Sequence, residues 1–510
     1  MNIQHLRPDL AKYAREIADI AKSHGLDFFE TRFELVDFDT MQEIAAYGGF
    51  PQRYPHWRFG MEYERLRKQH VYGLGKIYEM VINNDPCYAY LVSDNSVVDQ
   101  KLVMAHVYAH CDFFKNNYWF SKTNRKMMDE MANHSTRIRR HVDRYGFERV
   151  ERFIDLCSTL DNLIDPHAPF MQRTAKPVAD SGVSPEREVE RDIIRYKSKP
   201  YMEPWVNPPA ERSRQRESLM AQREKKKFAL PLQPLRDVLQ FLVDHAPLED
   251  WEADILSMIR EEAYYFAPQG QTKIMNEGWA TFWHSRLMTT RILKDDEIIT
   301  YADHHSGTTH MPPGQVNPYK IGVELFRDIE ERWNKGRFGK EYDECKSMEQ
   351  KRKWDKKLGK GMEKVFEVRR IYNDVTFIDE FLTPEFVDRF RMYHYRYDPS
   401  TRRMVVVNRD FDKIKAQLLF MLTNHAQPYI YVLDGNYGNR GELYMGHKHH
   451  GVDLDIKYAV ETLKNVQRIW RRPTHLQAMI NDEMVLFSFD GEQSQQQKIH
   501  GDMPSPAHAI

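Results

Sequence analysis

The chain opens with apolar residues at helical spacing, a pattern that recurs through its first 394 residues. Residues 10–24 carry apolar side chains three or four positions apart, between Asp9 as a candidate N-cap and Gly25 as a candidate C-terminal cap. This predicts an amphipathic helix. The other segments with helical periodicity are 98–120, 121–161 with a break at Gly146, 235–245, 251–266, 273–288, 319–334 and 340–373. The pattern predicts a mainly α-helical body.

After about residue 395 the pattern changes to short β-branched runs that alternate with two helical segments. The expected strands are 404–408, 429–434, 442–447, 475–481 and 483–489, and the expected helices are 410–424 and 455–471. Their order, βαββαβ with one extra strand, predicts a small ferredoxin-like α+β domain. Earlier in the chain, residues 76–82 and 87–91 are expected strands, and the aromatic, proline-bounded segment 54–60 is an expected loop.

Length and composition divide the chain into five regions. At 510 residues it exceeds the roughly 250–300 residues at which single cores stop growing, so more than one domain is expected. Residues 1–164 and 233–394 are expected to pack together as one helical domain. Residues 165–232, rich in proline and charge, predict a linker. Residues 395–490 form the expected α+β domain, and the Gln/Ser/Pro-rich residues 491–510 an expected disordered tail.

Charge and cysteine usage exclude several classes of partner. The chain has 74 Lys and Arg against 75 Asp and Glu, so it lacks the basic excess that binding to nucleic acid requires. No run approaches the roughly 20 apolar residues that a membrane-spanning helix needs. Four cysteines without C-x-x-C spacing, and no apolar leader, predict free thiols and a cytoplasmic location.

The clearest chemical signal is the pair His106 and His110, one helical turn apart. Residues i and i+4 lie on one face of a helix, so both imidazoles can bind a single ion. Glu277 follows in Asn-Glu-Gly-Trp-Ala, similar to the N-E-G-x-A segment of gluzincin peptidases, and His284 lies two turns further on the same face. We therefore expect His106, His110 and Glu277 to bind a divalent metal, zinc or iron. The expected fold class is mainly α, a zincin-like helical domain followed by a small ferredoxin-like α+β domain.

Val107 stands where the H-E-x-x-H signature has the glutamate that accepts a proton from water. A hydrolase would then need another base, and Asp112 and Glu262 are candidates. Tyr319 lies in a Pro/Gly-rich segment similar to one in thimet- and Taq-carboxypeptidase-like hydrolases. That resemblance implies that Tyr319 donates to an oxyanion, and that His304, His305 or His310 just before it is a transition-state histidine. Each has a structural alternative, such as a surface carboxylate or a tyrosine that caps a helix.

Four motifs together resemble the stage V sporulation protein R (SpoVR) family. They are Tyr54-Pro55-His56-Trp57 with Phe59-Gly60, the histidine pair followed by Asp112-Phe113-Phe114-Lys115-Asn116-Asn117, Met275-Asn276-Glu277-Gly278-Trp279-Ala280-Thr281-Phe282-Trp283-His284, and Asn317-Pro318-Tyr319 with Gly322. The resemblance spans nearly the whole chain. It implies a part in forming the spore cortex, a peptidoglycan layer, or in a stress response. The valine at position 107 matches the family's own pattern.

Three functional interpretations are open at this point. The first is a metal-dependent amide hydrolase that acts on a peptidoglycan precursor or a peptide. The second is a non-catalytic regulator on a zincin-like scaffold, which binds protein partners in sporulation or stress signalling. The third is a redox metal oxygenase, because two histidines and one carboxylate also suit iron. Val107 favours the second interpretation, and the presence of His106, His110 and Glu277 as a possible ligand set favours the first.

Overall fold

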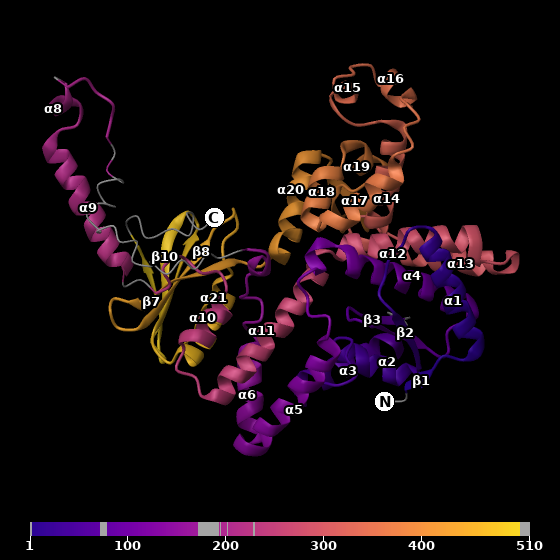
Figure 1. The fold of residues 1–510 in the computed structure, drawn as a ribbon, viewed down its shortest axis with the longest axis horizontal. Coiled ribbons are helices and arrows are strands. Elements are labelled where there is room, and N and C mark those ends of the chain that lie inside the picture. Colours follow the sequence, from indigo (N-terminus) through magenta and orange to yellow (C-terminus); the bar gives the residue numbers. More distant parts are fainter. Residues whose placement is uncertain are drawn as a thin grey trace. The chain divides into compact units, whose positions relative to one another are not determined.

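The computed structural model describes residues 3–71, 79–171, 193, 195–200, 202–227 and 230–499. The chain forms two compact units, and each is built from segments that are far apart in the sequence (Figure 1). Unit one contains residues 1–152 and 261–427, and unit two contains residues 153–260 and 428–510. The protein is mixed in class, rich in helix with small sheets. Among the described residues, no helix has the length and apolar character needed to cross a membrane.

Unit one contains a four-stranded sheet near its N-terminus. Its strands are β1 (Ile3–His5), β2 (Thr31–Val36), β3 (Glu79–Ile82) and β4 (Cys87–Val92), in the order β1-β2-β4-β3. Strands β2 and β4 are parallel, and the other pairs are antiparallel. The expected strands 76–82 and 87–91 are thereby confirmed, except that residues 76–78 lie outside the described part of the chain.

The helical core of unit one is built around α4 (Val97–Asn116) and α12 (Lys273–Leu287). On one side α4 packs with α1 (Pro8–Ser23), β2 and β4, and on the other it packs along α12 (Figure 1). Because both sides are covered, nearly every α4 residue from 99 to 114 is buried. Helix α12 in turn packs against α14 (Pro318–Lys335), and α14 packs on α17 (Gly361–Ile371).

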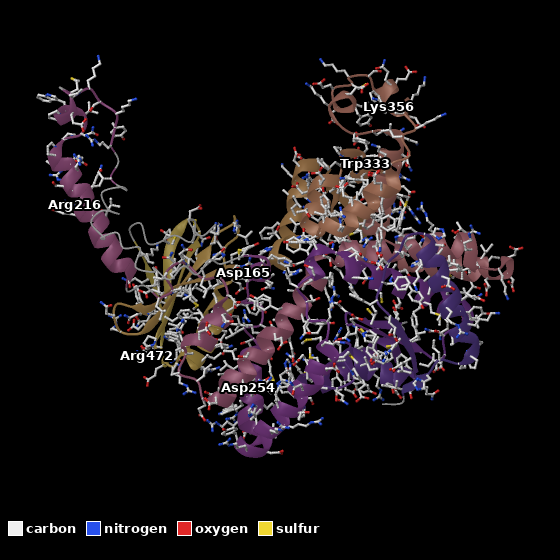
Figure 2. The ribbon with its side chains drawn as sticks, in the orientation of Figure 1. Asp165, Arg216, Asp254, Trp333, Lys356 and Arg472 are labelled. Atoms are coloured by element: carbon white, nitrogen blue, oxygen red, sulfur yellow. The ribbon has the colours of Figure 1, made fainter. Side chains whose placement is uncertain are left out.

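Aromatic side chains pack between these later helices, and one of them, Trp333, is labelled in Figure 2. The Trp333 ring stacks on Phe338 with 4.9 Å between ring centroids and meets Phe381 edge to face at 5.8 Å.

The expected helix 340–373 was wrong in its continuity, because the structure has three shorter helices there. They are α15 (Lys340–Asp343), α16 (Met348–Lys353) and α17, and Gly359 between the last two adopts a φ of 66°.

The remaining elements of unit one complete the helical body. They are α2 (Phe38–Ala46), α3 (Trp57–Val71), η1 (Tyr118–Phe120), α5 (Met127–Tyr145), the start of α6 (Phe147–Ser158), the end of α11 (Asp250–Gln271), η3 (Met288–Ile292), η4 (Asp295–Glu297), α13 (Ile298–Thr308), α18 (Asp374–Phe381), α19 (Pro384–Phe390), α20 (Phe411–Leu422) and η5 (Thr423–Ala426). The expected break at Gly146 is confirmed. The expected loop 54–60 was wrong in its second half, because Pro55 precedes the helix that begins at Trp57 and so does not interrupt it.

Unit two contains a five-stranded sheet of order β11-β10-β9-β8-β7. Its strands are β7 (Tyr429–Tyr437), β8 (Glu442–Lys448), β9 (Thr474–Ile480), β10 (Glu483–Phe489) and β11 (Ser494–Lys498). Helix α21 (Ile456–Trp470) connects the parallel strands β8 and β9, and the other pairs are antiparallel. The other helices described in this unit are η2 (Ala168–Phe170), α8 (Glu203–Val206), α9 (Pro209–Lys227) and α10 (Val238–His245), together with the end of α6 and the start of α11.

This topology differs from the ferredoxin-like order expected from the sequence. Strand β6 (Arg403–Asn408) pairs with β5 (His394–Asp398) in a separate two-stranded sheet, and α20 packs on α18. Both elements belong to unit one, so the five-stranded sheet contains one helical crossover instead of two. The division at residues 427 and 428 also lies 33 residues after the change in sequence pattern at residue 395.

The C-terminal region is ordered further than its composition predicted. Residues 494–498 form β11, which pairs with β10 from Ser494 opposite Phe489 to Lys498 opposite Val485. Backbone hydrogen bonds make this pairing, so the polar Gln/Ser composition does not prevent it. Residues 500–510 lie outside the described part of the chain, as do residues 172–192 of the expected linker.

Candidate metal centre

The two histidines lie on the face of α4 that packs against α12. The helix begins at Ser96, whose hydroxyl accepts a hydrogen bond from the Asp99 amide as an N-cap. The rings of His106 and His110 meet edge to face with their centroids 4.5 Å apart. Both side chains are buried, so their polar nitrogens require partners inside the protein.

Glu277 on α12 provides the third group. Its Oε2 lies 3.6 Å from His106 Nε2 and 3.5 Å from His110 Nε2. Tetrahedral ligands with bonds of about 2.1 Å are about 3.4 Å apart, so these separations suit one shared zinc ion. The oxygen is buried and accepts no hydrogen bond from any residue that the structure describes. A buried, unpaired carboxylate oxygen between two imidazole nitrogens fits a divalent cation well.

The start of α12 is fixed from a distant part of the chain. The carboxylate of Asp374, at the first residue of α18, accepts hydrogen bonds of 2.8 Å from the amides of Ile274 and Met275. These amides belong to the first turn of α12, where the helix offers no acceptors of its own. Asp374 thereby holds the turn from which Glu277 projects.

The nitrogen of each imidazole that faces away from Glu277 has its own partner. His106 Nδ1 lies 2.8 Å from His284 Nδ1, and His110 Nδ1 lies 2.8 Å from Asn276 Oδ1. Because the amide oxygen can only accept, His110 donates from Nδ1 and leaves the Nε2 lone pair toward Glu277. Lys273 donates to Glu277 Oε1 at 2.6 Å, which orients that carboxylate from its other side.

Burial and neighbouring charges set the protonation of these groups. Burial and the nearby His110 lower the pKa of His106 to about 4. For Glu277, burial alone would raise the pKa, but His106, His110 and Lys273 outweigh it and hold the pKa well below the usual range. Burial would lower the pKa of His110, but Glu277 and Asn276 raise it on balance. A neutral imidazole and an ionised carboxylate are the forms that bind metal.

Two further side chains border the ligand groups. The Tyr319 ring stacks on His106 with 6.3 Å between centroids and an interplanar angle of 22°. Burial and then Glu277 raise the pKa of Tyr319, so its hydroxyl stays protonated. Glu79 on β3 is half-buried. Burial and the nearby Glu277 raise its pKa to about 7, because together they outweigh the opposite effect of His110. Glu79 lies in no local motif of the sequence, and only strand pairing brings β3 near α4.

The other predicted site residues have different surroundings. His284 Nε2 lies 3.2 Å from His305 Nδ1, so His305 is connected to the site through His284. Asp112 accepts hydrogen bonds from Trp279 Nε1 at 2.9 Å and from the Asp27 amide at 2.8 Å, and so ties α4 to α12 away from the two histidines.

Glu262 pairs with Arg53 and His134 on other elements. The structure thus brings together His106, His110, Glu277 and Tyr319, with His305 one hydrogen bond further out. Asp112 and Glu262 contact other groups.

Fold and site together define a helix-rich protein with a candidate metal centre of two histidines and one glutamate. The chain belongs to the SpoVR-like family: the model described as "SpoVR like protein" matches residues 4–427, which end where the second segment of unit one ends. The chain is also 30% identical over 491 residues to the uncharacterized protein YcgB of Escherichia coli (strain K12), covering 90% of this chain and 89% of that protein. No solved structure matches the chain.

Proposed function

We propose that the protein is a metal-dependent hydrolase that cleaves an amide bond, with zinc or iron held by His106, His110 and Glu277. The observation that carries the proposal is the buried Oε2 of Glu277, unpaired among the described residues and about equally distant from the two Nε2 atoms. The paired helices α4 and α12 that carry these ligands support a zincin-like scaffold. A zinc ion at this position would act as a Lewis acid and lower the pKa of water.

Residues around the ligands have roles that follow from their chemistry. The protonated hydroxyl of Tyr319 can donate a hydrogen bond to the oxygen that gains negative charge when an amide carbonyl is attacked. Glu79, whose charge acts on His110, Glu277 and Tyr319, is the carboxylate that would accept a proton in place of the residue at 107. His284 and His305 form a hydrogen-bonded path from His106 toward α13.

The family supports a substrate class and a cellular process. SpoVR-like proteins are named for sporulation, in which the cortex peptidoglycan contains peptide amides. A peptidoglycan precursor or muropeptide, met in the cytoplasm, therefore suits an amide hydrolase of this family.

The second candidate is a non-catalytic regulator that uses the same scaffold to bind protein partners in sporulation or stress signalling. Val107 favours it, because the side chain is buried and has no proton to exchange.

Elemental analysis of protein purified without a histidine tag tests the centre itself. We expect about one zinc or iron per chain in the wild type and none in the His106→Ala/His110→Ala variant when the second site proposed below is left unoccupied by extensive dialysis. Incubation of the metal-loaded protein with muropeptides and release of free amine then tests the reaction. Folded wild-type protein that takes up no metal at His106 and His110 would support the regulator instead.

A further inference from the structure

A second group of potential ligands lies between α5 and α11 in unit one. Glu130 and His134 are one turn apart on α5, and Glu261 projects from α11. One ligand atom of each of the three residues lies within 4.8 Å of the others. His134 Nε2 is 3.4 Å from Glu261 Oε2, again close to the separation of two ligands on a tetrahedral ion.

Glu262 and Arg53 orient His134 from the opposite side. His134 Nδ1 lies 3.2 Å from Glu262 Oε1, and Arg53 donates to Glu262 Oε2 at 2.6 Å. A carboxylate that accepts from Nδ1 fixes the ring and leaves Nε2 for a metal, the arrangement common to histidine ligands in proteins. His134 is fully buried, and its Nε2 makes no hydrogen bond to any described residue.

The charges of the cluster favour a divalent cation. Glu262 pairs with Arg53. Glu261 and Glu262 outweigh burial and raise the pKa of His134 to about 9, so a bound cation would replace the proton on its Nε2. Two carboxylates then remain beside a buried imidazole nitrogen. Glu261 is partly exposed, with 43% of its side chain accessible, so water can complete the coordination shell. A mixed set of one histidine and two carboxylates suits Mn²⁺ or Zn²⁺.

We propose that Glu130, His134 and Glu261 form a second divalent-cation site, built from residues distinct from those of the His106 centre. A bound ion ties α5 to α11. Through Glu262 and Arg53 it also fixes the segment that carries Tyr54 and Phe59, because the Arg53 guanidinium lies over both rings, 5.2 Å and 4.9 Å from their centroids. The Ser135 hydroxyl donates to the Arg53 carbonyl at 2.9 Å and strengthens the same connection. The site therefore gives the aromatic segment at 54–59 a structural anchor.

The test uses the full-length His106→Ala/His110→Ala variant, from which the first centre has been removed. We expect it to retain about one Mn²⁺ or Zn²⁺ per chain after incubation with that ion and gel filtration, and its melting temperature to rise with added ion. Adding Glu261→Gln should lower the affinity at least tenfold. Gln can still accept the hydrogen bond from Asn124 to Glu261 Oε1, and the side chain is partly exposed, so this variant is expected to fold.

Two controls make the result specific. His141→Gln, two turns after His134 on α5, should leave the bound ion unchanged, whereas His134→Gln should remove it. If the His106→Ala/His110→Ala variant is folded by circular dichroism but binds no ion and shows no shift in melting temperature, the cluster is an ion-pair network only and the proposal is wrong. This outcome is independent of the hydrolase proposal, because it concerns residues outside the His106 centre.

Discussion

Gly278 on α12 and Gly322 on α14 face each other where the two helices cross, so closely that a β-carbon on Gly278 would lie 2.4 Å from the Gly322 α-carbon. The backbones themselves are in contact at this crossing. Glu277 precedes the first glycine, and Tyr319 lies three residues before the second. The contact between the two glycines therefore sets how near the carboxylate and the phenol can come.

Gly278→Ala should force the two helices apart. We expect it to lower the free energy of unfolding by about 1–3 kcal/mol or more and to weaken metal binding, because the added methyl group has no space. Thermal unfolding and metal titration measure both effects. Gly307→Ala on α13 is the matched control, since no atom lies within 4 Å of the added methyl group, and it should be neutral or slightly stabilising.

Glu277→Gln should reduce metal affinity at the first centre at least about tenfold while the fold is retained. The amide is the same size as the carboxylate but has no negative charge to offer the ion. Competition with a chelator gives the affinity. Glu331→Gln, on a surface ion pair with Lys335, is the control and should bind metal like the wild type. Unchanged affinity in Glu277→Gln would remove this residue from the ligand set.

Glu79→Gln should separate binding from turnover. If Glu79 accepts the proton, the variant keeps its metal and loses about 10²–10⁴-fold in amide hydrolysis. Glu34→Gln changes another half-buried carboxylate of the same sheet and should keep its activity. Loss of metal from Glu79→Gln would show instead that this residue is a ligand.

Val107→Glu tests whether the centre lacks only a glutamate at the usual position. Val107 is fully buried and belongs to an apolar cluster with residues of α1, β2 and β4. We expect the carboxylate to cost about 3–5 kcal/mol of stability and to create no hydrolysis, because it is buried without a partner. Val97→Glu, at an exposed position on the same helix, should cost little. A folded Val107→Glu protein with raised hydrolysis would contradict this expectation.

The stability of unit two should fall in mild acid because of His447. Burial, with His449 and His450, lowers the pKa of His447 to about 4, compared with about 6.5 in an unfolded chain. The unfolded state therefore takes up a proton between pH 6.5 and 4 that the folded state does not. The stabilisation is fully present above pH 6.5 and lost as the pH falls toward 4, by about 1–3 kcal/mol.

Native-state hydrogen exchange of β8, corrected for intrinsic rates, measures this change between pH 7.5 and 4.5. In His447→Asn the loss should be absent or much smaller. An equal loss in both proteins would assign the acid sensitivity to other groups.

Local patterns predicted the elements, and the three candidate ligands that the structure brings together, better than they predicted the partners of those elements. The spacing of His106 and His110 fixes their common face on any helix, and the Asn-Glu-Gly-Trp-Ala motif pointed to Glu277. The approach of Glu79 and the hydrogen bond from His110 to Asn276 depend on how strands and helices pair across long stretches of sequence, which periodicity does not encode. The run of β-branched residues likewise predicted strand β6 in the right place. However, β6 pairs with β5 and is not part of the larger sheet.

The two segments of unit one lie in the sequence on either side of residues 153–260, the first segment of unit two. During synthesis, a ribosome that has released residues 1–152 has made only the half that carries the two histidines. The glutamate, and the aspartate that caps its helix, follow more than a hundred residues later. The candidate metal centre can therefore be completed only late in translation, once both segments of unit one have been made.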